Sequence, residues 1–210
     1  MIDCTLGRGV GGGLLECLRV LTLLGVHELG AALSAPRART VPVCLGPRAR
    51  MAPVSLLPLR PVALVAEEVA WLAARFPGRV AVGVAPGALP LDFEAMGVPF
   101  EEKLDRFRAD LPRLVAMLHG DDLDPLAGDL ALARCKEHPV PVISTALSPG
   151  AVRRAAAAGA GIVYDGASAL DRLRTLSDAY DQAGGDGPKV LIRRVWLGAP
   201  PREAFDRQEA

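Results

Sequence analysis

Three hydroxyl side chains lie close together between a short apolar run and a predicted helix. They belong to Ser144, Thr145 and Ser148, and Pro149 follows directly. A serine before a proline is typical of a helix start, because the hydroxyl caps the first turn and proline needs no amide partner there. Hydroxyls and free amides at a helix start favour a bound phosphate. This segment is our candidate phosphate site, and the alternative is that Ser148 only caps its helix.

Two further loops could serve the same site. Arg48, in the loop Gly46–Arg50, could pair with a phosphate or an anionic substrate. The alternative for this arginine is an ordinary surface position. Gly87, in Ala85–Gly87, has no side chain, so that a flat ring could approach its backbone. The alternative for Gly87 is a plain turn glycine.

No residue pattern identifies a catalytic side chain or a metal site. The four cysteines lack the spacing of a metal site or a disulfide framework. His119 precedes Gly120 at an expected helix end, where an imidazole interacts with the helix dipole. Gly7–Gly12 matches a dinucleotide-binding pattern, but the segment around Glu28 is too short for the second strand that such a site needs.

Short apolar runs alternate with helical segments, and this alternation predicts a parallel α/β fold. Most of the runs are nearly continuous, as expected for strands buried on both faces. The predicted strands are Thr40–Leu45, Arg79–Val84, Val140–Ser144, Gly161–Tyr164 and Val190–Leu197, with Ile2–Leu6 as an uncertain sixth.

Helices are predicted from apolar residues at helical spacing. One stripe consists of Val62, Val65, Val69 and Leu72, and another of Leu104, Phe107, Leu111, Leu114, Val115 and Leu118. Pro112 is expected to kink or restart the second helix. A helix from Pro149 should stop at Gly159, and Ser168 with Asp171 has the spacing of a capping box for the last helix.

The composition is that of a globular protein of one domain. Half of the 210 residues are hydrophobic, and 24 basic residues balance 24 acidic ones. The absence of a basic excess argues against nucleic acid or an anionic membrane as partner. The apolar stretch Leu14–Leu24 contains Glu16 and Arg19, so it is not expected to span a membrane. We expect a cytoplasmic enzyme.

Four blocks of sequence follow one another along the chain: Leu57–Leu72, Pro77–Gly87, Asp92–Phe100 and Val140–Gly159. Taken in this order, they resemble the luciferase-like monooxygenase family. In that family the similar segments are a helix after the third barrel strand, the turn and strand that follow, a segment before a charged helix, and a late strand with its phosphate-side loop. The order and spacing of four blocks are more specific than any single motif.

The resemblance implies a TIM-type (β/α) barrel of parallel strands with outer helices. A complete barrel needs eight strands and roughly 250 residues, so the resemblance implies an incomplete one. Residues 40–198 would form the barrel domain, residues 1–39 an atypical helical segment in place of the early strands, and residues 199–210 a polar tail. Because unpaired strand edges need cover, we expect a homodimer or a heteromeric partner.

The resemblance also implies an oxidoreductase that uses reduced flavin and dioxygen on a small organic substrate. The cofactor would be FMN, or alternatively the deazaflavin coenzyme, and a flavin reductase is an expected partner. Two departures favour a second reading, a flavin- or partner-binding protein without turnover. Arg60 and Pro61 are adjacent where the family usually has a histidine between them, and residues 1–39 contain no counterpart of the family's early Asp-His pair.

Overall fold

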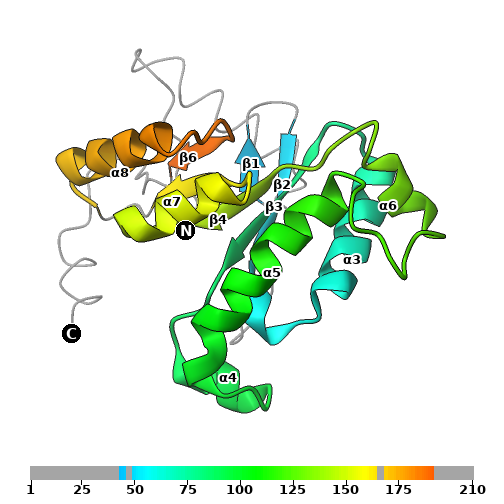
Figure 1. The fold of residues 1–210 in the computed structure, drawn as a ribbon, viewed down its shortest axis with the longest axis horizontal. Helices are drawn as coiled ribbons and strands as arrows, with labels where there is room; N and C mark the ends of the chain where they lie inside the picture. The colour runs from blue at the N-terminus through cyan, green and yellow to red at the C-terminus, as the bar shows by residue number, and fades with distance from the viewer. Residues whose placement is uncertain (1–42, 46–48, 165–167, 192–210) are drawn as a thin grey trace, which may run out of the picture.

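The computed structural model describes residues 43–45, 49–164 and 168–191, with only the backbone described for 43–45 and 49–53. Strands and helices alternate along most of this part of the chain (Figure 1). Three of these elements are short helical turns: η2, η3 and α6. In order, the elements are β1 Val43–Leu45, β2 Ala49–Leu56, η2 Leu57–Leu59, α3 Val62–Arg75, β3 Val80–Ala85, α4 Pro90–Ala95, η3 Phe100–Glu102, α5 Lys103–Leu118, α6 Leu130–Arg134, β4 Val142–Thr145, α7 Pro149–Ala157, β5 Gly161–Tyr164, α8 Leu170–Gln182 and β6 Lys189–Leu191.

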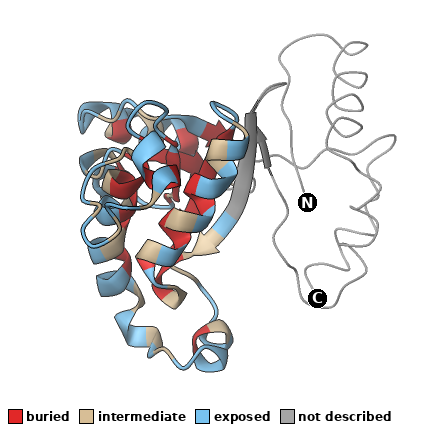
Figure 2. Ribbon diagram, turned by 90° about the vertical axis from the view of Figure 1, so that its right-hand side faces the viewer, coloured by how far each residue is buried: buried red, intermediate tan, exposed pale blue. Residues whose placement is uncertain are grey.

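The strands form one six-stranded sheet in which the spatial order follows the chain order. β1 is antiparallel to β2, and each later strand is parallel to the one before it. Figure 2 shows the described helices on one face of the sheet, as right-handed crossovers require. The structure therefore confirms the predicted parallel α/β fold with outer helices. Among the described strands the sheet is open, with β1 and β6 at its edges.

β2 is the main difference from the sequence prediction, which places a loop at Gly46–Arg50 and no strand between Leu45 and Leu57. The strand pairs with β1 on one side and β3 on the other. Its register shifts between Ala52 and Val54, and Pro53 occupies the shift. A bulge of this kind accommodates a proline, which has no amide to donate within the sheet.

The two predicted edge strands lie only partly within the described residues. The first is Val43–Leu45 and is antiparallel to its neighbour, in contrast to the expected parallel strand from Thr40. The last is Lys189–Leu191, and the remainder of the prediction, 192–197, lies outside the described residues. The predicted segments 1–39 and 199–210 lie outside them as well.

The main core lies between the sheet and its helices. Val62, Val65 and Val69 of α3 are buried as predicted, whereas Leu72 is 42% exposed. The α5 stripe is buried except for Leu104. A small second cluster occupies the other face of the sheet and consists of Ala81, Ile143, Val163 and Val190. Burial on both faces explains why these strands are nearly continuous apolar runs.

The predicted start and stop of α7 are confirmed, α5 continues through Pro112, and α8 starts one residue later than predicted. Ser148 caps α7, and Gly159 stops it with a φ of 71°. α5 does not restart at Pro112, which lies exposed inside the continuous helix, so that the missing amide is at a solvent-facing position. α8 begins at Leu170, and its N-cap position is Ala169, one residue after the predicted Ser168.

Two features are missing from the part of the chain that the structure describes. No helix there combines the length and the apolar character that crossing a membrane requires. No group of three or more histidine, cysteine, aspartate or glutamate residues there is arranged to hold a metal ion.

Candidate functional site

The carboxyl ends of the parallel strands meet at one edge of the sheet, where ligands bind in folds of this type. Thr145 ends β4, and Gly87 lies two residues beyond the end of β3. The two strands are neighbours, and Val84 pairs with Ser144. The structure therefore brings Gly87 and the hydroxyl segment Ser144–Ser148 to the same edge.

Ser144 and Thr145 point to opposite faces of the sheet, because successive side chains in a strand alternate. Ser144 is 2% exposed on the helix-covered face, and its Oγ donates a hydrogen bond of 3.2 Å to the Thr145 carbonyl. Thr145 is half-buried and shares the opposite face with Ile143. That face is the interior side in a (β/α) barrel, so Thr145 is the better placed of the two for a ligand.

Ser148 has the capping role that the sequence predicts. Its Oγ accepts a hydrogen bond of 3.2 Å from the Ala151 amide. The helix itself offers no acceptor to the amide of Gly150, as is general in a first turn. Amides in this position attract anions, so the capped end of α7 can contribute to a phosphate site.

Gly87 is explained in part by its own surroundings. Its φ is 86°, and a Cβ added there would lie 2.6 Å from Cε2 of Phe93. Phe93 is fully buried on α4. Backbone conformation and the Phe93 ring thus account for glycine at this position, and its contact with a cofactor stays a prediction.

Arg48 lies outside the described residues. Its contact with a phosphate or an anionic substrate stays a prediction.

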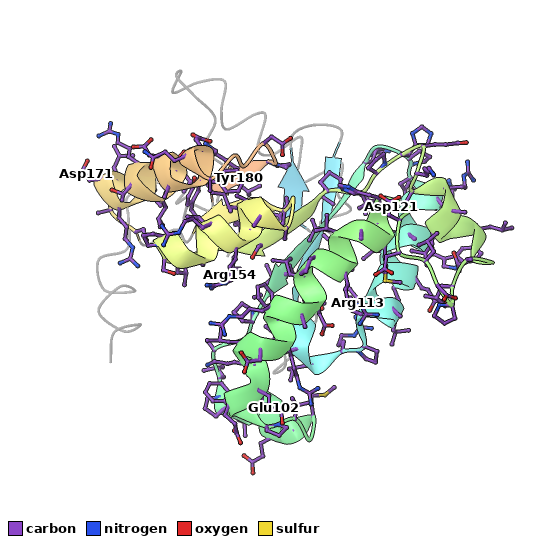
Figure 3. All side chains as sticks on the ribbon, viewed as in Figure 1. Glu102, Arg113, Asp121, Arg154, Asp171 and Tyr180 are labelled. Atoms are coloured by element: carbon purple, nitrogen blue, oxygen red, sulfur yellow. The ribbon has the colours of Figure 1, made fainter. Side chains whose placement is uncertain are left out.

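Arg172 is a basic residue at this edge that the sequence analysis does not identify. Its Nη2 donates a hydrogen bond of 2.8 Å to the carbonyl of Leu147, which directly precedes Ser148. Arg172 lies in the first turn of α8, which Figure 3 marks by the label on Asp171. α7 and α8 pack side by side (Figure 1), so that one guanidinium reaches from α8 to the loop before α7.

Tyr164 provides a second feature that the sequence analysis overlooks. It ends β5 beside the same loop, where the Ala146 amide donates to the Val163 carbonyl. The residue is 7% exposed, and its hydroxyl has no hydrogen-bond partner among the described residues. A buried hydroxyl without a partner is unfavourable, and a ligand group can satisfy it.

The residues with shifted pKa values lie away from this edge. Burial raises the pKa of Tyr180, which lies near the starts of β5 and β6 (Figure 3). Its hydroxyl donates a hydrogen bond to the Ala160 carbonyl at 2.8 Å and accepts one from the Gly187 amide at 3.0 Å. Burial also raises the pKa of Asp110, midway along α5, and of Cys135, just after α6. Within the described residues, the groups whose pKa burial raises thus lie outside the candidate site.

The two described histidines lie at the opposite edge of the sheet. His119 follows α5, as predicted, close to where Val140 donates to Leu118 before β4. His138 lies in the same connection to β4. Neither is near the carboxyl ends of the strands, so among the described residues no imidazole is placed for catalysis at the candidate site.

The parallel strands with outer helices can be compared with known families. The family model for luciferase-like monooxygenases matches residues 51–208. This chain belongs to that family. The match covers most of the chain, including every described element after β2, and it confirms the resemblance inferred from the four sequence blocks.

Relatives of this luciferase-like chain are known from mycobacteria. An uncharacterized protein of Mycobacterium tuberculosis is 33% identical over 140 residues, which cover 63% of this chain and 48% of the relative. A protein of Mycobacterium bovis matches with the same identity and coverage. The chain thus spans about half the length of the curated relatives that it matches.

Two solved structures share the fold of the chain. The oxygenating constituent of 3,6-diketocamphane monooxygenase from Pseudomonas putida, in complex with FMN, has 17% identity and a TM-score of 0.57, over 98% of this chain and 70% of that one. A monooxygenase from Streptomyces bottropensis has 19% identity and a TM-score of 0.55, over 76% and 53% respectively. At these identities the likeness establishes the fold alone.

Proposed function

We propose that this luciferase-like chain binds the phosphate end of FMN at the loop between β4 and α7 and acts in a flavin-dependent monooxygenase reaction on a small organic substrate. The deazaflavin coenzyme is the alternative cofactor. The observation that carries the proposal is the Arg172–Leu147 hydrogen bond, which holds a cation at a capped helix start. Family membership supports the reaction class.

The residues at this edge suit a phosphate group. Arg172 has further N–H donors besides the one bound to Leu147, and a guanidinium is well matched to phosphate oxygens. The first turn of α7 contributes amides, and Thr145 contributes a hydroxyl from the barrel side. Tyr164 lies beside the same loop, in the core on the helix-covered face, and its hydroxyl lacks a partner among the described residues.

The chain's own contribution would be to bind and orient the cofactor and to keep water away from it. Bound reduced flavin supplies the electrons that activate dioxygen, so the protein needs few reactive side chains. Ala81, Ile143 and Val163 form a buried apolar cluster on the interior face next to Thr145, which keeps water away from that side of the sheet.

A second function, flavin binding without turnover, is favoured by one observation. The described histidines, His119 and His138, both lie away from the carboxyl edge. Oxygen consumption, measured with a flavin reductase, an electron donor and a substrate, distinguishes the two functions. A protein that only binds FMN would consume no oxygen with any substrate.

The test is fluorescence titration of the full chain with FMN and with the deazaflavin coenzyme. Arg172→Gln should weaken binding of the preferred cofactor about tenfold, as expected for loss of one charge-assisted hydrogen bond. Arg174→Gln is the matched control, because Arg174 lies on the same helix and pairs with exposed Asp171 at 3.2 Å. The control should stay within about twofold of the wild type.

The double substitution Ser144→Ala with Thr145→Ala should also weaken binding, and Thr145→Ala alone should account for most of the loss. The reason is that Ser144 already donates to a backbone carbonyl on the other face. Equal affinities for the wild type, the Arg172 variant and the double variant would remove the proposed phosphate site.

A further inference from the structure

A small pocket lies at the amino edge of the sheet, opposite to the candidate cofactor site. It is enclosed by the end of α3, by α6, and by the turns that lead into β3 and β4, with a volume of about 200 Å³. α3 and α6 pack side by side (Figure 1). Pockets for drug-sized ligands measure roughly 300–1,000 Å³, so this one suits a smaller molecule.

The floor of the pocket is apolar and closely packed. Ala70 and Ala131 are 0% and 3% exposed, and Ala73 with Ala74 continues the wall along α3. The Sγ of Cys135 donates a weak hydrogen bond to the Ala131 carbonyl at 3.5 Å. Because this thiol is buried and already engaged, it acts as a small apolar group in the floor.

The rim of the pocket carries positive charge and hydrogen-bond donors. Arg134 and His138 both line it and are exposed. No aspartate or glutamate is among the lining residues, and Arg134 forms no ion pair with any residue that the structure describes. The pocket therefore offers an apolar surface beside a guanidinium without a counter-ion.

We propose that this pocket binds a small carboxylate with an apolar body, of about the size of benzoate. The apolar body would pack against the alanines of α3 and α6. The carboxylate would accept hydrogen bonds from the guanidinium of Arg134 and from an imidazole N–H of His138, the arrangement that guanidinium and carboxylate geometry favour. The site is separate from the proposed flavin site, because the two lie at opposite edges of the sheet.

Titration of the full chain by nuclear magnetic resonance, with benzoate and with uncharged benzyl alcohol, tests the proposal. Benzoate should bind more tightly than the alcohol and shift the amide signals of α6, His138 and Val140. Arg134→Gln should weaken benzoate binding about tenfold and leave the alcohol unchanged. Lys136→Gln is the control for charge, since Lys136 is exposed near Arg134 but does not line the pocket, and it should change benzoate affinity by less than about twofold.

Ala73→Leu should abolish the binding of both compounds by filling the pocket from its half-buried wall, with an unchanged circular dichroism spectrum. Equal affinity for benzoate and the alcohol would overturn the anion preference. Displacement of bound benzoate by FMN would overturn the site. Benzoate affinities of the Ala73 and Arg134 variants equal to that of the wild type would overturn it as well. None of these results depends on whether the chain binds flavin.

Discussion

The packing of Phe93 against Gly87 leaves no room for a side chain at position 87. The backbone of Gly87 is in the left-handed region, at a φ of 86°, and the Phe93 ring occupies the space where a Cβ would be. Two separate costs therefore oppose any side chain at this position, backbone strain and overlap with a fully buried ring.

We predict that Gly87→Ala lowers the free energy of unfolding by about 2–3 kcal/mol, measured by urea denaturation. Gly97→Ala is the matched control, because Gly97 has a φ of 66° but no atom within 4 Å of an added Cβ. The control should lose only about 1 kcal/mol, the backbone contribution. Equal losses in the two variants would mean that Phe93 moves aside without cost.

Asp110 on α5 gives the chain a distinct dependence on pH. Burial raises the pKa of its carboxyl above the ordinary 3.8, although Arg113 and Arg106 act in the other direction. A raised pKa means that the folded chain binds this proton more tightly than the unfolded chain. The contribution of Asp110 to stability therefore increases as pH falls from the raised pKa to the ordinary one.

Asp110→Asn should accordingly raise the Tm at pH 7 by a few degrees at most, and the gain should vanish near pH 3. Thermal unfolding of both proteins across this range provides the measurement. Asp105→Asn, at an exposed carboxyl paired with Arg108 at 2.8 Å, is the control and should show no such gain. An Asp110 variant less stable than the wild type at pH 7 would show that the attraction to Arg113 dominates.

Site residues whose role depends on neighbours in the sequence could be predicted, and those that depend on distant ones could not. Ser148 caps α7 through the amide of Ala151, three residues away, so that its role is visible in the sequence. Arg172 reaches Leu147 across 25 residues, and only the packing of α8 on α7 brings them together. The unsatisfied hydroxyl of Tyr164 is likewise a property of the folded chain.

Among the elements, strands buried on both faces were predictable, and β2 was not. Residues 80–85 form an unbroken small and apolar run that is buried throughout. β2 instead contains Arg50, Pro53 and Ser55, so neither alternation nor an apolar run marks it. Its pairing with β1 and β3 outweighs this weak local preference, as is common in sheets.

The short helix α6 depends on a single capping residue. One carboxylate oxygen of Asp129 accepts hydrogen bonds from the amides of Ala131 and Leu132, both at 2.8 Å. A helix of five residues has little stability of its own, so the cap and the packing on α3 hold it.

We predict that Asp129→Ala destabilises the chain by about 1 kcal/mol in urea denaturation, because both amides lose their acceptor. Asp129→Asn should keep most of the stability, since the amide oxygen can still cap the helix. A loss of similar size in the asparagine variant would assign the effect to the charge of Asp129 and not to the cap.

The described sheet leaves β1 and β6 at its two edges, and this bears on the assembly of the molecule. We propose that the chain forms a homodimer or binds a protein partner. Light scattering of the purified chain across a range of concentrations should give twice the mass of 22.0 kDa, or show association with an added flavin reductase. A constant monomer mass with no association would contradict the proposal.

The order of the strands also bears on how the chain folds during its synthesis. Each described strand pairs with the strand that precedes it in the chain, from β1 to β6. During synthesis on the ribosome, each described strand would find its preceding partner already released. The described sheet can therefore be extended strand by strand, before the whole chain has been made.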